Sequence, residues 1–485
     1  MTAPAAGGGP LEIRHPARWV PERRYVASVV LGTWLGFEVR FIEQERADTE
    51  ISRPDAPGTV AVAEGTFALA EEQRLRAGSV PRPPFPRWRV TDPSLRACVT
   101  SDWLPVVGVR DGVEPIVVSP DRVEIRFDLF GWSFLSLTRY EEAVGDERDS
   151  HGRFPLSASV AYEGGFHQRP LVDEYANVLA WALEAAGVGP RPRQDGYGVA
   201  LTHDVDRPVA ALEDGVRGLA RRTAADLVVR RDAGLAMRRL TAFPGARRAG
   251  FSRDPNYTFE LLMDVAEAAG QTALFNILAR TRVEPGPEPA SPMDAAYRLT
   301  DPPIRTLLRR VRERGHRIGL HGSYNSYGSA EQMSLEMGNL RLALDDLGIG
   351  SDRLPARQHY LRWAAPETWR HLDQAGALFD STLGYAEAPG FRCGTCRPFP
   401  VFDLETRTAL SLWEHPLIVM DVALQPASLQ RGPIDDVLRQ VDGVVSMCKD
   451  IGGEFVVLWH NNNAIGRRGE TVYREIVRLA CGGVP

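Results

Sequence analysis

The sequence has little of what secreted, membrane-spanning or nucleic-acid-binding proteins need. Only five of its 485 residues are cysteine, an odd and small number that excludes a disulfide framework and favours a reducing compartment. The net charge of −6 argues against a nucleic-acid partner. The apolar run at 26–37 is too short and too interrupted to span a bilayer. Residues 1–10 lack the basic and apolar segments of a signal peptide. We therefore expect a cytoplasmic protein without a transmembrane segment.

The composition is that of a folded protein large enough for two domains. Hydrophobic residues make up 44% of the chain and charged residues 25%, which is ordinary for globular proteins, and 485 residues exceed one usual core. A Gly/Pro-rich connector at 187–196 follows a helical stretch at 171–186. We expect residues 1–190 to form a mixed α/β domain of unknown function, and residues 196–485 to form a second domain. The first ten residues are expected to be disordered.

The N-terminal and C-terminal halves of the chain differ in their predicted secondary structure. The N-terminal half predicts strands without any cluster of chemically active residues, at 38–42, 105–109, 115–118 and 123–127. The C-terminal half alternates strands and helices. Its expected strands are 199–202, 273–278, 317–321, 354–359, 377–380, 411–415 and 454–459, and its expected helices are 257–269, 303–314, 330–347, 367–375 and 434–450. This alternation predicts a parallel sheet covered by helices, either a barrel or a doubly wound sheet.

Polar residues end nearly every strand of the second half. Asp204 and Asp206 end the first strand, and the others are Asn276, His321, His359, Asp380, Glu414, His415 and His460. Functional groups gather at the carboxyl ends of parallel strands in both candidate folds. Residues two apart on a strand share a face, and two carboxylates held that close are costly without a cation or a proton between them. The pattern indicates a metal-dependent hydrolase.

An arginine-rich insertion follows the first of these strands. Residues 207–253 contain eleven arginines and four acidic residues. The segment is either a solvated helical cap or a basic lid that attracts an anionic substrate or a membrane surface.

Five motifs in order carry a family resemblance. They are Thr-His-Asp-Val-Asp at 202–206, the segments 319–326 and 356–363, the segment 379–385 running on to 390–395, and the segment 456–463. Together they resemble the polysaccharide deacetylase (NodB-homology) family of carbohydrate esterases, over about residues 198–485, in the bacterial branch with a His-Asp-Val-Asp first motif. Residues 127–142 and 151–154 are similar to the uncharacterised domain that precedes the catalytic domain in that branch. The resemblance implies a distorted (β/α) barrel and removal of an acetyl group from a sugar.

The resemblance also implies a metal site, expected to hold a divalent cation with Zn²⁺ as the leading candidate. The family's first motif has a ligand that falls on Val205 here, so the role is transferred to Asp206. His321 matches the first histidine of the second motif, and Asn325 stands where a second histidine is usual. An amide oxygen is a poorer zinc ligand than imidazole, and His203 or His359 could supply the missing nitrogen.

Catalytic roles follow from the same resemblance. Asp204 matches the general base and His460 the general acid, which protonates the departing amine. Arg357 would orient Asp204, the backbone N–H of Tyr360 would face the oxyanion, and Asp380 would tune His460.

A carbohydrate is the expected partner, in a soluble or a lipid-linked precursor that would require peripheral membrane contact. The residues expected to contact it are His359, Arg362, Trp363, Arg392 and Trp459. Tyr385 and the two tryptophans could equally be core residues, and Cys393 and Cys396 have a spacing that also suits zinc or redox chemistry. The oligomeric state is left open.

Two other functions remain compatible with the sequence. The chain could be a catalytically inactive descendant that binds a glycan, which the asparagine at 325 favours. It could also hydrolyse another small amide or imide, because a fold does not fix a substrate.

Overall fold

The computed structural model describes most of the chain. The described residues are 9–109, 112–189, 196–209, 216–229, 231–246, 254–279, 291–295, 297–350, 353–424 and 433–483. The N-terminal residues 1–8, most of the connector expected at 187–196, and parts of the arginine-rich insertion lie outside them. The division at this connector stays a prediction.

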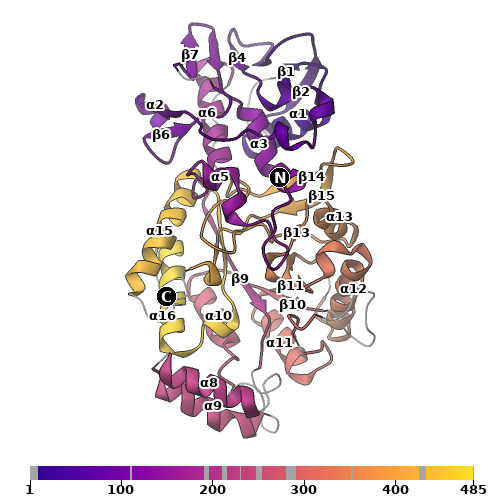
Figure 1. Ribbon diagram of the computed structural model, residues 1–485, viewed down its shortest axis with the longest axis vertical. Helices are drawn as coiled ribbons and strands as arrows, with labels where there is room; N and C mark the ends of the chain where they lie inside the picture. The colour runs from indigo at the N-terminus through magenta and orange to yellow at the C-terminus, as the bar shows by residue number, and fades with distance from the viewer. Residues whose placement is uncertain are drawn as a thin grey trace.

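The N-terminal region is built around a six-stranded mixed sheet (Figure 1). The sheet order is β2-β1-β3-β4-β8-β7. The strands are β1 (Leu11–His15), β2 (Val39–Glu43), β3 (Thr49–Ser52), β4 (Thr59–Val62), β7 (Ile116–Ser119) and β8 (Arg122–Ile125). The region's longer helices are α1 (Val20–Ala27), α3 (Leu129–Leu137) and α6 (Leu171–Ala185), and α6 contacts β4 and β8. The two helices α4 (Tyr140–Val144) and α5 (Val160–Glu163) follow α3.

The sequence predicted this region only in part. The expected strands at 38–42, 115–118 and 123–127 correspond to β2, β7 and β8, whereas β1, β3 and β4 were not expected. The strand expected at 105–109 is wrong, because only Pro105 belongs to a strand, β6 (Trp103–Pro105), which pairs with β5 (Arg87–Arg89). Gly108 has φ 81° and turns the chain there.

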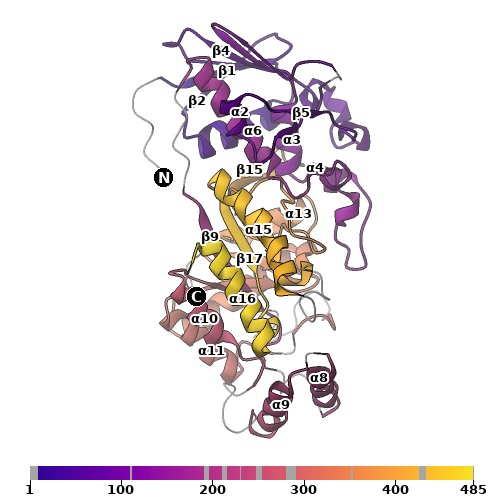
Figure 2. The same cartoon turned by 90° about the vertical axis from the view of Figure 1, so that its left-hand side faces the viewer.

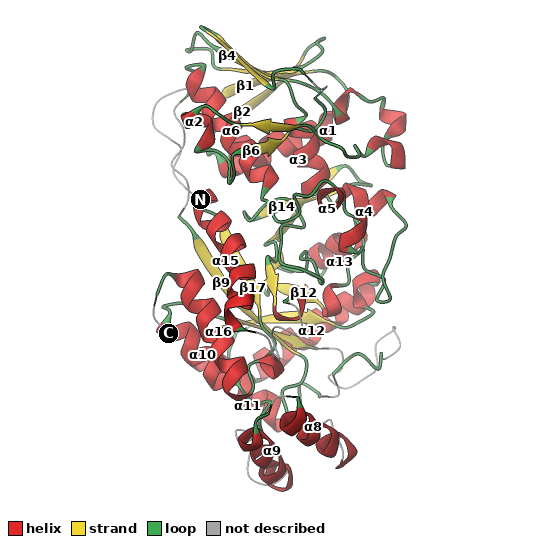
Figure 3. Cartoon of the chain, turned by 60° about the vertical axis from the view of Figure 1, so that its left-hand side comes forward, coloured by secondary structure: helices red, strands yellow, loops and turns green. Residues whose placement is uncertain are grey.

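The C-terminal region contains a curled nine-stranded sheet (Figure 3). Its order is β14-β15-β13-β12-β11-β10-β9-β17-β16, and every neighbouring pair is parallel except β14 with β15. The strands are β9 (Gly198–Val205), β10 (Leu274–Leu278), β11 (Arg317–Gly322), β12 (Ala356–Gln358), β13 (Phe379–Asp380), β14 (Phe399–Asp403), β15 (Thr408–Glu414), β16 (Val419–Met420) and β17 (Glu454–Leu458). The predicted α/β fold, a distorted (β/α) barrel with a mixed α/β region before it, is confirmed.

Amphipathic helices cover this sheet. They are α10 (Phe259–Ala268), α11 (Pro302–Glu313), α12 (Ala330–Asp346), α13 (Glu367–Gln374), α15 (Ile434–Ile451) and α16 (Gly466–Cys481). In α11 the buried residues Ile304, Leu307, Leu308 and Val311 recur at the three- and four-residue spacing of one helical face. All five expected helices are present, whereas α16, β14 and β16 were not expected. The two-residue β16 is too short for a periodic signal.

The two regions meet where α1 contacts β15 and where Phe134 of α3 packs on Phe402 of β14 (Figure 1). Tyr25 Oη donates to the carbonyl of Pro400 at 2.8 Å. Arg392 pairs with Glu142 at 2.6 Å, and both side chains are buried. A buried charge needs such a partner, so this pair connects the two regions.

A helical hairpin protrudes from the end of the molecule opposite the N-terminal sheet (Figure 2). It comprises α8 (Val216–Val228) and α9 (Ala233–Ala246), which pack on each other and share the buried Arg239–Asp226 ion pair at 2.6 Å. Within the described residues, no helix has the length and apolar character required to cross a membrane.

Candidate metal and active site

The register of the parallel strands brings the polar strand ends together. Asp204 on β9 lies opposite Asn276 on β10, and His321 on β11 lies opposite Arg357 on β12. Side chains alternate along β9, so Val205 points into the core with no exposed surface, and the acids on either side of it share the other face. The alternation therefore supports Asp206, and not Val205, as the second acid of the site.

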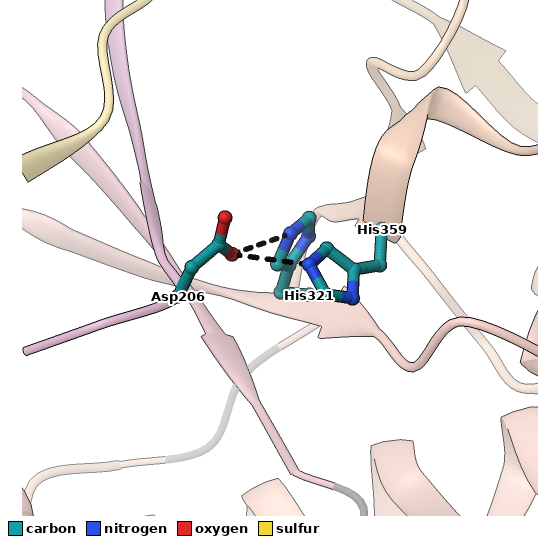
Figure 4. Close-up of side chains that lie close together, drawn as sticks. All are labelled: Asp206, His321 and His359. Atoms are coloured by element: carbon teal, nitrogen blue, oxygen red, sulfur yellow. Dashed lines mark ion pairs between the residues drawn. The ribbon is translucent and has the colours of Figure 1, made fainter. Parts of the chain in front are cut away.

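Asp206, His321 and His359 form the one group that could hold a metal ion within the described residues (Figure 4). One ligand atom from each lies within 4.8 Å of the other two. The Oδ1 of Asp206 is 3.2 Å from Nε2 of His321 and 3.5 Å from Nε2 of His359. Two imidazoles and one carboxylate form a donor set that zinc favours.

The second nitrogen of each imidazole is already engaged. His321 Nδ1 lies 3.0 Å from the carbonyl oxygen of Arg357, which can only accept, so Nδ1 carries the proton. His359 Nδ1 lies 3.2 Å from Oδ1 of Asp294 in the same manner. Metal-bound histidines are typically oriented in this way. Nε2 is therefore the nitrogen of each ring that faces Asp206.

Two buried atoms at the centre of this group lack a hydrogen bond. They are Oδ1 of Asp206 and Nε2 of His321. Buried polar atoms are nearly always hydrogen-bonded, and an exception requires an explanation. A divalent cation would supply the missing partner for both atoms, so the residues present fit the implied metal.

Opposite charges in this site shift the pKa values of Asp206 and His359. Burial raises the pKa of Asp206, but the imidazoles of His359 and His321 outweigh burial and keep that pKa well below its usual value. Burial lowers the pKa of His359, whereas Asp206 and Asp294 raise it, to about 9. A site of this kind favours a bound positive charge.

Asp204 is held beside the metal-ligand group by three neighbours. Its Oδ1 accepts from Asn276 at 2.8 Å and from Arg357 at 3.2 Å. Its Oδ2 is 3.7 Å from Nε2 of His321. Burial raises the pKa of Asp204, but the charges of His321, Arg357 and His460 lower it overall. Asp204 is thus an ionised carboxylate with one oxygen free to accept a proton. A glycine at 319 makes this arrangement possible, because a Cβ there would lie 2.5 Å from Oδ1 of Asn276.

His460 lies on the other side of Asp206 and is supported by Asp421. Its Nε2 is 3.6 Å from Oδ2 of Asp206, and its Nδ1 is 2.7 Å from Oδ1 of Asp421. The backbone N–H of His460 also donates to Asp421, at 2.8 Å. Burial lowers the pKa of His460, but Asp421 and the two site acids raise it to about 10.

Three predicted residues are placed differently from their expected roles. The side-chain oxygen of Asn325, expected to bind the metal, accepts from Arg362 at 2.9 Å. His203 lies outside the metal-ligand group, with Nδ1 on the carbonyl of Trp459 at 2.8 Å. Asp380 is buried against Glu414 on the neighbouring strand, so the carboxylate that contacts His460 is Asp421.

Most of the expected sugar contacts are structural. Trp363, Trp459 and Tyr385 are at most 4% exposed and cannot stack on a sugar. Arg392 is buried against Glu142, and Arg362 binds the backbone carbonyls of Tyr324 and His151. The Cys393–Cys396 loop is also buried, and the Cys396 N–H donates to Asp173. Tyr360, by contrast, is 36% exposed beside His359.

Sequence reasoning missed two supporting residues, Asp421 and Asp294. Asp421 ends the apolar run at 417–420, so the rule that identified the other strand ends could have found it. Asp294 lies in a loop, where no strand or helix pattern marks it.

Comparison with known proteins gives limited matches. Residues 11–187 match the model of DUF7033, a family of unknown function. The search of curated proteins found no match. A solved structure assigned as a polysaccharide deacetylase from Mycobacterium smegmatis matches with TM-score 0.38 and 16% identity, over 60% of this chain and 85% of that one.

Two further solved structures resemble the chain to a similar degree. The allantoinase Puue matches with TM-score 0.35 and 12% identity, over 59% of this chain and 84% of its own. A solved structure assigned as a polysaccharide deacetylase from Pseudomonas aeruginosa PAO1 matches with TM-score 0.32 and 12% identity, over 66% of this chain and 90% of that one.

Proposed function

We propose that this chain is a metal-dependent hydrolase of the polysaccharide deacetylase type, which removes an acetyl group from an amino sugar or a glycan precursor. The carrying observation is the group of Asp206, His321 and His359, in which the buried atoms Oδ1 of Asp206 and Nε2 of His321 have no hydrogen bond. Asp204 and His460 lie on either side of it. A bound divalent cation, with Zn²⁺ favoured by the donor set, would supply Lewis acidity and activate a water molecule.

The two flanking residues suit opposite proton transfers. Asp204 Oδ1 is held by Asn276 and Arg357, so Oδ2 is the oxygen that takes a proton from the attacking water. His460 Nδ1 lies on Asp421, so Nε2 is the nitrogen that delivers a proton to the departing amine. The lowered pKa of Asp204 and the pKa of about 10 of His460 give each group the required protonation state at neutral pH.

The backbone at Tyr360 supports a third role. Tyr360 has φ 60° and Leu361 has φ 54°, which are uncommon values for residues with large side chains. Strained backbone of this kind clusters at functional sites. Tyr360 directly follows His359, and the proposal assigns its N–H to the developing oxyanion.

Acetate release and metal content test this function together. The purified chain is stripped with a chelator, reloaded with Zn²⁺ and assayed on N-acetylglucosamine oligomers. We expect one equivalent of zinc per chain, and acetate release that requires the metal. Loss of either in His321→Ala, but not in His415→Ala, would support the site. His415 is a matched control because it also follows a strand and pairs with a carboxylate, Glu454 at 2.7 Å. Absence of both zinc and acetate release in the wild type would refute the function.

The protruding hairpin supports a lipid-linked substrate. Its exposed apolar residues are Val216, Leu227, Val228, Met237 and Leu240, at 46–74% exposure. Its exposed arginines are Arg217, Arg221, Arg231 and Arg238. Apolar and basic side chains together bind the surface of anionic membranes. More of the protein should therefore sediment with phosphatidylglycerol vesicles than with phosphatidylcholine vesicles. The double substitution Val228→Ser and Met237→Ser should decrease the amount that sediments with phosphatidylglycerol. Equal sedimentation with both lipids would contradict this contact.

A further inference from the structure

A short loop of the N-terminal region is folded rigidly by its own contacts. The loop comprises residues 149–153, within the segment that matches the family of unknown function. The carboxylate of Asp149 accepts from the N–H groups of His151 at 2.8 Å and Arg153 at 2.9 Å, and it pairs with the Arg153 guanidinium at 2.6 Å. Gly152, with φ 73°, closes the turn by donating to the carbonyl of Asp149 at 2.9 Å. Asp149 and Gly152 therefore close the loop from within, and Arg362 of the barrel also donates to the carbonyl of His151 at 2.7 Å.

This loop reaches across to the barrel beside the candidate metal ligands. The imidazole of His151 packs on the ring of Tyr360 with 4.6 Å between centroids, and its Nδ1 is 3.1 Å from Oη of Tyr324. Arg153 donates to the carbonyl of Tyr360 at 3.1 Å. The Tyr360 ring in turn lies 4.8 Å from the His359 ring. This N-terminal loop thus contacts both the ring and the backbone carbonyl of the residue that follows a candidate ligand.

The aromatic surface made by this contact is accessible. Tyr360 is 36% exposed, and His151 is half-buried. Within the described part of the chain, Nε2 of His151 has no hydrogen-bond partner, because its one ring contact of this kind uses Nδ1. An exposed ring offers an apolar face, and a free ring nitrogen beside it offers a polar group. A sugar ring presents the matching combination of C–H bonds and hydroxyls.

We propose that His151 and Tyr360 form a sugar-binding subsite next to the metal-ligand group, which the N-terminal region completes. The N-terminal region thereby determines which glycan is held at the site. The ligand class, an oligosaccharide of N-acetylated hexosamines, rests on the proposed function. His151 is a positioning residue, because its ring holds Tyr360 and the substrate but lies outside the proton-transfer groups.

Binding and turnover of tri-N-acetylchitotriose test this subsite separately. Calorimetric binding is measured on the full zinc-loaded chain carrying Asp204→Asn, so that the probe is not consumed, with and without His151→Ala. We expect His151→Ala to weaken binding about tenfold, as for loss of an aromatic contact. In the otherwise wild-type chain, it should raise KM by a similar factor with kcat little changed, the signature of lost ground-state binding.

Two variants and two further measurements control the test. His151→Phe keeps the ring but loses the ring nitrogen, so it should recover only part of the binding that His151→Ala loses. Ser150→Ala changes an exposed residue of the same loop and should have no effect. Zinc content and melting temperature should stay at the parent values. Unchanged binding in His151→Ala would overturn the proposal, as would a loss of zinc or a lowered melting temperature, which would indicate a structural role. No chitotriose binding by the parent would also overturn it. Binding by the parent without acetate release by the wild type would leave the subsite standing and refute the proposed hydrolase.

Discussion

Two aspartates, one in each region, show how similar sequence contexts lead to different chemistry. Asp128 and Asp206 each come shortly after a strand, β8 and β9 respectively. Asp128 accepts from Gly65, from both the N–H and the hydroxyl of Thr66, and from Gly131 at the start of α3. Asp206 instead has a buried oxygen without a hydrogen bond that faces two imidazoles.

The pKa values of the two acids are shifted in opposite directions. Burial raises the pKa of Asp128 despite its hydrogen bonds, whereas the imidazoles keep that of Asp206 well below its usual value although it too is desolvated. A buried acid saturated by N–H and O–H donors serves the architecture of its region. A carboxylate with a buried oxygen that lacks a hydrogen bond, next to two imidazoles, is equipped to bind a cation.

The largest effect on activity is expected from substituting Asp206, the aspartate of the barrel. Asp206→Asn should remove one metal ligand and its charge, and a metal ion contributes several kcal/mol to transition-state stabilisation, or about 1,000-fold in rate. Zinc content and kcat/KM measure this loss, and urea unfolding should show a stability close to that of the wild type. Normal zinc content in Asp206→Asn would remove this aspartate from the site.

The matching substitution of Asp128 in the N-terminal region should lower the free energy of unfolding. Asp128→Ala would leave buried N–H and O–H donors without an acceptor and remove a helix cap, at a cost of about 2–4 kcal/mol in the free energy of unfolding. Urea denaturation measures this cost. The folded fraction should keep its zinc, and a loss of metal without a loss of stability would contradict the contrast with Asp206.

A smaller effect is expected from Asp421, whose carboxylate contacts the proposed general acid His460. Asp421→Asn removes a charge that raises the pKa of His460, to about 10 in the wild type, so His460 should lose its proton at a lower pH. The alkaline limb of the kcat–pH profile should therefore move to lower pH, with a decrease in kcat of about 10- to 100-fold. Asp380→Asn should leave that limb in place, because Asp380 pairs with Glu414 and not with His460. An unmoved limb in Asp421→Asn would exclude His460 as the general acid.

The smallest effect is expected at Asn325. Its side-chain oxygen accepts from Arg362, so we expect it to be unavailable to a metal ion. Asn325→Ala should then change zinc affinity by less than about threefold, as for substitutions away from a site. His359→Ala should weaken zinc affinity far more. Competition with a chromophoric zinc chelator measures both, and the reverse order would restore Asn325 as the third ligand.

The expected and observed strands of the barrel agree where a strand is a continuous apolar run that ends in polar residues. The expected strands at 199–202, 317–321 and 454–459 lie within one to three residues of β9, β11 and β17, because buried parallel strands are continuous apolar runs with polar ends. The short β16 and the antiparallel β14 were missed. They give two or five residues of signal, and β14 contains a proline. Asp421 was missed along with β16.

The amino-acid sequence by itself determined the alternating barrel and the acids and histidines that end its strands, since both follow from short-range periodicity. The tertiary structure alone decided that His359 lies with Asp206 and His321, and that Arg362 donates to the side-chain oxygen of Asn325. It also decided that Asp421 supports His460, and that an N-terminal loop lies against Tyr360. These are contacts between residues 37 to 209 positions apart. Strand register and domain packing create such contacts, and no local pattern encodes them.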